Sequence, residues 1–314
     1  MSEMKESSAK LLESYQVRKT AVQKFVFFKW LHGHLKGYGY EIRNDQYSEK
    51  GNNFIVGDVE KASVIISAHY DTAPNSIFPM FMGFSNWFSF IISQFISIIP
   101  IFVIPLIYFI LNADKSGGMI TFDPTPVIFF YLVYSFQLMF GFANRHTAND
   151  NTSGVATLIS ILEELPEKDR SKLCVVFFDQ EELGLIGSIR FHQRYKTQLA
   201  GKPIINFDCV SDGDTLTFVT KKAFRESEFS GKLEKAAEKA VQGSKKKLRF
   251  CNASTNIYMS DQLHFTSGVG VVAAKKLPLF GYYINRIHSS LDKKFDSENI
   301  KILTKTVVSF AESI

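Results

Sequence analysis

The chain has little cysteine and no pattern typical of export. Only three of its 314 residues are cysteines, and they are widely spaced: Cys174, Cys209 and Cys251. So few thiols do not make a disulfide framework or a thiolate zinc site. The first residues are charged and do not lead into the apolar core of a secretory signal peptide. We therefore expect reduced thiols and a cytoplasmic location for the soluble part of the chain.

An excess of charge of one sign is also missing. The 36 lysines and arginines nearly balance the 31 aspartates and glutamates, which leaves a formal net charge of +5. This balance does not indicate a nucleic-acid-binding protein. Hydrophobic residues make up 46% of the chain, which is too many for a disordered protein and enough for a substantial core. The composition predicts one or two globular domains.

One long stretch lacks charge entirely. Residues 72–113 contain no Asp, Glu, Lys, Arg or His, and 14 of the 30 phenylalanines lie between Thr72 and Arg145. Residues 87–111 are long enough for a helix to cross a hydrocarbon layer of roughly 30 Å at about 1.5 Å per residue. A second, shorter uncharged run covers residues 126–144. We interpret residues 77–144 as an inserted transmembrane helical hairpin that enters the lipid bilayer and returns to the same side.

Other interpretations of this stretch remain. The two runs could be buried helices of a soluble core, a lid or an oligomer interface, and residues 77–90 could lie along a membrane surface. Pro100 and Pro105 are compatible with a membrane helix. The connecting loop at 112–125 has a net charge of −1, and the rest of the chain is basic. By the positive-inside tendency, we expect a multi-pass membrane protein with a cytoplasmic catalytic domain.

The remainder of the chain alternates between strand and helix patterns. An N-terminal helix is expected within residues 4–36, and near-continuous apolar strands then alternate with amphipathic helices. The expected strands are 53–56, 63–67, 173–178, 203–207, 215–219, 248–251 and 269–274, and the expected helices are 152–165, 184–195, 223–241 and 297–314. This order predicts an α/β fold with a mostly parallel central sheet flanked by helices. We assign residues 1–76 and 145–314 to one catalytic domain, with 77–144 inserted into it.

Acidic and imidazole side chains follow several of the buried strands, precede the helix expected at 152–165, or stand late in the chain. They are His69, Asp71, Asp150, Glu181, Glu182, Asp208 and His288. In a parallel sheet such residues converge beyond the carboxyl ends of the strands. Each one taken singly has an ordinary explanation, such as a helix cap for Asp150 or a surface position for His288. Together they predict a metal site, and the excess of carboxylates suits two divalent ions such as Zn²⁺.

The same residues carry a resemblance to a known family. The sequence contains His69-x-Asp71, Asn149-Asp150-Asn151-x-Ser153-Gly154, Glu181-Glu182-Leu183-Gly184-x-x-Gly187-Ser188, Asn206-Phe207-Asp208 and the late His288. In this order they resemble the co-catalytic zinc aminopeptidases of clan MH, the relatives of aminopeptidases S and Y. The resemblance covers about residues 40–76 and 145–314, and it implies a zinc-exopeptidase-like fold and peptide substrates.

The resemblance also implies a role for each residue. His69 and Asp208 would hold one zinc ion, Glu182 and His288 the other, and Asp150 would bridge the two. Glu181 would act as the general acid and base, and Asp71 would orient His69.

The sequence departs from the family on the substrate side. The stretch Ser260-Asp261-Gln262-Leu263-His264 resembles a motif that commonly has His where Gln262 stands. Ser260, Asp261 and His264 are therefore our candidates for substrate contacts, with His264 as a substitute for the missing histidine.

The leading hypothesis is a membrane-anchored di-zinc aminopeptidase that acts on short peptides. One alternative is a glutaminyl-cyclase-like aminoacyltransferase with a single zinc ion. Another is a membrane protein that keeps the fold only to bind peptides. The sequence does not predict the oligomeric state or the preferred N-terminal residue.

Overall fold

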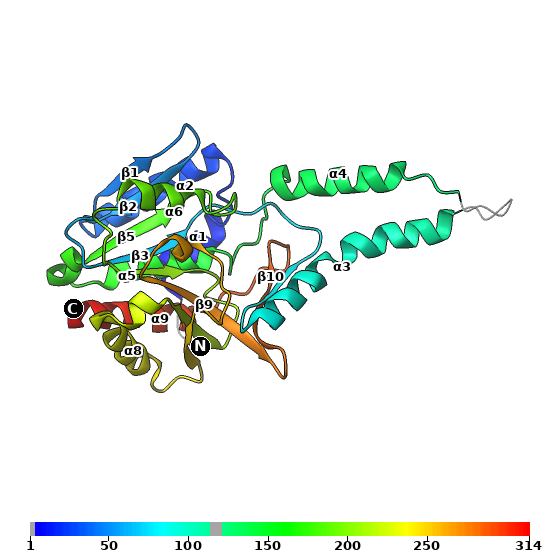
Figure 1. The fold of residues 1–314 in the computed structure, drawn as a ribbon. Helices are drawn as coiled ribbons and strands as arrows, with labels where there is room; N and C mark the ends of the chain where they lie inside the picture. The colour runs from blue at the N-terminus through cyan, green and yellow to red at the C-terminus, as the bar shows by residue number, and fades with distance from the viewer. Residues whose placement is uncertain (1–3, 114–120) are drawn as a thin grey trace.

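The structure is a computed structural model that describes residues 4–113 and 121–314. A twisted sheet lies between layers of helices, and two long helices project from one side of this body (Figure 1). The predicted α/β class is confirmed.

Over residues 4–113 and 121–314, the sheet has ten strands. They are β1 Ile42–Gln46, β2 Asn52–Val56, β3 Val64–His69, β4 Met80–Gly83, β5 Leu173–Phe178, β6 Ile204–Phe207, β7 Thr215–Thr220, β8 Lys247–Asn252, β9 Gly268–Leu277 and β10 Gly281–Ile287. The main path runs β1-β2-β5-β3-β6-β9-β10-β4, and β7 pairs with both β8 and β9. The central strands β5, β3, β6 and β9 are parallel, whereas β1, β2, β4 and β10 pair in antiparallel fashion. The sequence did not predict β1, β4 or β10.

Helices pack on both faces of this sheet, except for α3 and α4, which project from the body (Figure 1). They are α1 Glu6–Ser14, α2 Ala21–Gly37, α3 Trp87–Asn112, α4 Thr125–Phe140, α5 Thr152–Glu164, α6 Ile186–Arg194, α7 Lys222–Arg225, α8 Glu228–Val241 and α9 Ser297–Ser313, with 3₁₀ helices η2 Glu167–Lys172 and η3 Asp261–His264. The single helix expected at 223–241 is thus divided into α7 and α8.

Strand residues alternate between two cores because successive side chains point to opposite faces. Ile66, Val175 and Phe177 pack with α1, α2, α5, α8 and α9 on one face. Ile65 and Val176 pack with α6 on the other face. Strands β3, β5 and β6 are buried along their whole length, which explains their continuous apolar sequences.

The prediction of a single N-terminal helix within residues 4–36 is wrong in detail. The chain forms two helices, α1 and α2, with a break at residues 15–20. Thr20 and Gln23 form a capping box that starts α2. Arg18 lies in the break and is fully buried.

Helices α3 and α4 form the projecting pair. Among the described residues, α3 is the one helix long and apolar enough to cross a membrane, and only 6% of its most apolar window is buried. The shorter α4 lies beside it, and the Tyr131 hydroxyl donates to the Ile101 carbonyl at 3.2 Å. Helix α3 leads away from the body and α4 leads back, so both ends of the pair join the same side of the body (Figure 1). Asp114 and Lys115 of the connecting loop lie outside the described residues.

The root of this hairpin is built into the sheet. Residues 80–83 form β4, which pairs with β10. This part of the inserted stretch therefore belongs to the sheet of the body. Phe84 follows in a buried cluster with Tyr258 and Ile287. A bridge between Pro74 and Ala143 joins the two ends of the inserted stretch. The projecting part is therefore the helices α3 and α4, and the chain on either side of them belongs to the body.

Candidate metal centre

Six of the predicted site residues meet at the carboxyl ends of the central parallel strands. His69 is the last residue of β3, Asp208 follows β6, and Glu181 and Glu182 follow β5. Asp150 precedes α5, and His288 follows β10. Because the parallel strands end at one edge, side chains more than 200 positions apart in sequence lie within contact distance.

One group of possible ligands consists of His69, Asp150 and Asp208. The Nε2 atom of His69 lies 3.2 Å from Oδ1 of Asp150 and 3.6 Å from Oδ1 of Asp208. All three residues are buried.

A second group consists of Asp150, Glu182 and His288. The Nε2 atom of His288 lies 3.0 Å from Oδ2 of Asp150 and 3.1 Å from Oε2 of Glu182. Asp150 thus directs one carboxylate oxygen to each group, which is the geometry of a carboxylate shared between two ions.

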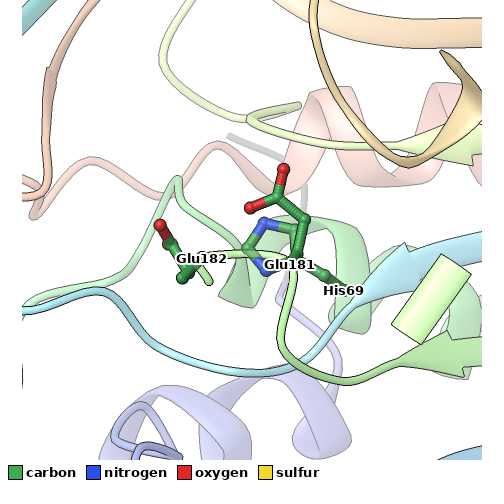
Figure 2. A group of neighbouring side chains, drawn as sticks. All are labelled: His69, Glu181 and Glu182. Atoms are coloured by element: carbon green, nitrogen blue, oxygen red, sulfur yellow. The ribbon is translucent and has the colours of Figure 1, made fainter. Parts of the chain in front are cut away.

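Glu181 stands beside both groups. Its carboxylate points away from that of Glu182, as Figure 2 shows for these two residues and His69. Glu181 also belongs to a third candidate combination with His69 and Glu182. Its carboxylate therefore lies close enough to act on a molecule held at the site.

Asp71 fixes the turn that carries the two glutamates. Its Oδ1 accepts the backbone N–H of Glu181 at 3.0 Å, and its Oδ2 accepts that of Glu182 at 3.2 Å. Oδ1 also lies 3.4 Å from Nδ1 of His69, the ring nitrogen opposite the one that faces the ligand group. One carboxylate therefore ties the end of β3 to the loop after β5.

Asp292 supports Asp150 and was not found from the sequence. Its carboxylate accepts the backbone N–H groups of Asn149 at 2.7 Å and of Asp150 at 2.9 Å. Burial raises the pKa of Asp292 to about 8. In the sequence it stands between Leu291 and Lys293, where nothing distinguishes it from a surface acid.

Arg18 is a second residue that the sequence did not indicate. Its Nη1 lies 3.3 Å from Oγ1 of Thr152, and its Nε donates to the carbonyl of Tyr70. Burial lowers the pKa of Arg18 to about 10, while the charges of Asp71 and Asp150 oppose that change. Arg18 therefore places a buried positive charge behind the acidic cluster.

The charges of the cluster suit bound cations. Burial alone would lower the pKa of His69 and of His288, but the surrounding carboxylates hold both well above the ordinary value. Burial raises the pKa of Glu181 well above its ordinary value. Such a cluster attracts protons or metal ions strongly.

Unpartnered polar atoms point to the same conclusion. Within the described part of the chain, Oε1 of Glu182 and Oδ1 of Asp208 are buried without a hydrogen-bond partner. Buried polar atoms ordinarily have partners. Imidazole nitrogens and carboxylate oxygens are ligands that zinc accepts, so the residues fit this metal.

The structure separates the three candidate substrate contacts. Asp261 is fully buried, and burial raises its pKa to about 7, with His69 and Asp208 among the charges that act on it. Ser260 accepts a hydrogen bond from Asn206 at 2.9 Å. His264 lies elsewhere, because its charged neighbours are His192 and Lys221. The structure thus does not bring His264 to the cluster.

Comparisons with known proteins agree with this fold. The sequence model described as Peptidase family M28 matches residues 134–311, more than half of the chain. No curated protein matches the chain.

Several solved structures share the architecture. Glutaminyl cyclase from Porphyromonas gingivalis is 15% identical, with a TM-score of 0.57 over 98% of this chain and 95% of that one. Glutaminyl cyclase from Macrostomum lignano is 13% identical, with a TM-score of 0.59 over 98% and 88%. A Zn-dependent exopeptidase from Parabacteroides distasonis is 15% identical, with a TM-score of 0.55 over 97% and 94%. At these identities the likenesses establish a shared fold.

Proposed function

Because the chain belongs to Peptidase family M28, we propose that it is a di-zinc aminopeptidase that removes N-terminal residues from peptides. The observation that carries this proposal is the pair of ligand groups that meet on Asp150. His69 and Asp208 would hold one ion, and Glu182 and His288 the other.

Bound zinc supplies Lewis acidity, which lowers the pKa of water and polarises a peptide carbonyl. Glu181 then acts as the base. It takes a proton from the attacking water and delivers it to the amine that leaves when the peptide C–N bond breaks. Asp71 keeps Glu181 in place through its backbone N–H.

The inserted hairpin is the second part of the proposal. Helix α3 has 26 residues and is therefore about 39 Å long, whereas a hydrocarbon core is roughly 30 Å thick. Its uncharged surface is exposed along most of its length. We assign it, with α4, to a lipid bilayer, and we place the catalytic body on the cytoplasmic side. The division into residues 1–76 and 145–314 on one hand and 77–144 on the other stays part of this proposal, with 77–86 packed on the body.

A glutaminyl-cyclase-like aminoacyltransferase is the second candidate. It is supported by the two cyclases that share the fold over nearly the whole chain. The two functions differ in metal content. Elemental analysis of the purified full chain should give two zinc ions per chain for the aminopeptidase and one for the cyclase.

The decisive variant is Glu181→Gln. We expect hydrolysis of aminoacyl chromogenic substrates to fall by a factor on the order of 10² to 10⁴, because the base is lost. Zinc content should stay unchanged, because Glu181 is not a ligand in this proposal. The matched variant Glu182→Gln should lose zinc as well as activity. Undiminished hydrolysis by Glu181→Gln would contradict the proposal.

A peptide-binding protein without catalysis is the third reading. It would require a chain that binds peptides but does not turn them over when zinc is supplied. Parallel measurement of peptide binding and hydrolysis separates this reading from the other two.

A further inference from the structure

The metal centre and the root of the hairpin are in direct contact. The backbone N–H of Ser76 donates to the carbonyl of His288 at 2.6 Å. The neighbouring N–H of Asn75 donates to the carbonyl of Phe142, just beyond α4, at 2.7 Å. The side chain of Gln137 in α4 donates to the carbonyl of Asn75 at 2.8 Å. His288, a candidate metal ligand, is therefore linked to α4 by hydrogen bonds through the adjacent residues Ser76 and Asn75.

The length of α3 places this root close to the lipid surface. A helix of about 39 Å exceeds a hydrocarbon core by about 9 Å. The excess is of the order of one headgroup layer. Trp87, the first residue of α3, is 62% exposed, and tryptophan is enriched at this depth of a membrane. With α3 inserted in a bilayer, the site beside the root would stand at the level of the headgroups.

Exposed apolar side chains stand close in sequence to the residues of the metal centre and of the hairpin root. We call Ile77, Leu183, Met259 and Leu291 the apolar rim. Each is more than half exposed, and they come from four separate segments. Leu183 follows Glu182, Leu291 is three residues after His288, and Ile77 follows Ser76. Because Glu182 and His288 lie 3.1 Å apart, the segments that carry Leu183 and Leu291 adjoin the cluster.

Exposed cations stand next to the rim. Arg145 ends the second uncharged run, and Lys293 and Lys294 follow Leu291 closely. Burial lowers the pKa of His146, and the charges of Lys293 and Arg145 lower it further. Both cations therefore lie near His146. Basic residues at the root of a membrane segment attract anionic headgroups. The segments that adjoin the site therefore carry exposed apolar and basic side chains, although Lys294 also pairs with Asp212 at 3.3 Å, and this composition suits the surface of an anionic leaflet.

We propose that the substrates are peptides that lie in the membrane surface, with their apolar side chains against the lipid and the apolar rim and their free N-terminus at the metal centre. This inference rests on the proposed aminopeptidase function and on insertion of the hairpin. A soluble peptide would gain nothing from the rim, whereas a membrane-bound one meets the site at its own depth.

Two peptides of equal length test the inference. Both begin with the same four residues, and one continues as an apolar amphipathic segment while the other continues as a polar one. The full-length, zinc-loaded chain is reconstituted in phosphatidylcholine vesicles that contain phosphatidylglycerol. We expect kcat/KM for the amphipathic peptide to be at least about tenfold higher, mainly through a lower KM. The preference should disappear when the peptide is bound to separate vesicles that lack the enzyme.

A rim variant provides the second measurement. Leu183→Ser combined with Met259→Ser should reduce the ratio of kcat/KM between the two peptides, since apolar contact area is lost. Val22→Ser, at a 71% exposed position on α2, should leave that ratio unchanged. Equal kcat/KM for both peptides would overturn the inference and leave the aminopeptidase function standing. Failure to cleave even a small aminoacyl chromogenic substrate would instead overturn the proposed function.

Discussion

Asp71 joins three parts of the site through one side chain. It accepts two backbone N–H groups from the Glu181-Glu182 turn and lies beside Nδ1 of His69. A carboxylate in that position holds an imidazole in the orientation that presents its other nitrogen to a metal. His69 and the two glutamates therefore depend on a residue that does not itself belong to a ligand group.

The variant Asp71→Asn tests this dependence. An amide offers one acceptor oxygen in place of two, so one N–H of the turn loses its partner and His69 loses its orienting charge. We expect zinc affinity, measured by competition with a chelating dye, to fall about 10- to 100-fold. Asp45→Asn is the control. Asp45 is also buried, but it lies on the outer strand β1, where it pairs with Arg194 of α6. An equal loss of affinity in both variants would contradict the assignment.

Single residues also show where sequence reasoning ended. The sequence predicted His69, Asp150, Glu182, Asp208 and His288 because their residue types stand in a recognisable order of motifs along the chain. Asp292 and Arg18 act through backbone contacts with residues far along the chain, and such contacts leave no local pattern. His264 was expected at the site because it is only two residues from Gln262, but the 3₁₀ helix η3 turns it toward His192.

Among single elements, α5 carries the contact that holds the N-terminal helices. Glu163 of α5 lies 2.8 Å from Nε2 of His34 in α2 and 2.9 Å from Nζ of Lys5, the N-cap residue of α1. Burial alone would raise the pKa of Glu163, but the contacts with His34, Ser7 and Lys5 outweigh it and hold the pKa at about 2.

A pKa below the ordinary 4.5 makes this contact dependent on pH. A depressed pKa stabilises the fold above the unfolded value, and that stability is lost as pH falls through the folded value. We expect Glu163→Gln to lower the free energy of unfolding of zinc-free protein by ~1–3 kcal/mol at pH 7. The gap between variant and parent should close as pH falls from about 4.5 towards about 2, as measured by denaturant titration in detergent.

The neighbouring Glu164 supplies the control for that prediction. Its side chain is more exposed, although it also pairs with Lys5 at 2.8 Å. Glu164→Gln should change the free energy of unfolding by at most ~1 kcal/mol, the range of surface ion pairs. A gap for Glu163→Gln that persists unchanged at pH 3 would show that the charge is not responsible.

Helix α3 yields the prediction about the membrane. Phe102 lies near its middle and is 62% exposed. An arginine at the centre of a membrane helix costs about 2.5–3.5 kcal/mol of insertion free energy. We therefore expect Phe102→Arg to reduce the fraction of protein that floats with vesicles in a density gradient. Asn112→Arg, at the end of the same helix, should float like the parent. Equal flotation of Phe102→Arg and parent would indicate that α3 is a lid or an oligomer interface.

For the whole molecule, the metal centre joins elements that are distant in sequence. Its five ligand candidates stand on β3, at the start of α5, and on the segments after β5, β6 and β10. Three of them are carboxylates, which repel one another without a cation. Metal bound at this centre would therefore stabilise the folded state as well as support the reaction.

Chelation tests that coupling. Treatment of the full chain with a zinc chelator should abolish hydrolysis and lower Tm, and added Zn²⁺ should restore both. At a free concentration 100 times Kd, a ligand adds about 2.7 kcal/mol to the free energy of unfolding. The variant Asp150→Asn should show the low Tm with or without Zn²⁺. A Tm that does not respond to the metal in the parent would contradict the coupling.

The sequence by itself determined the fold class, the family, the succession of the central strands and helices along the chain, and the list of residues with metal-binding chemistry. These features follow from local patterns, because the spacing of apolar residues and the turn residues between them can be read from neighbouring positions. Tertiary structure alone decided how β4 and β10 join the root of the hairpin to the sheet and which carboxylate oxygen faces which histidine. It also decided that Asp292 and Arg18 support the cluster, because contacts between distant segments depend on how the layers pack.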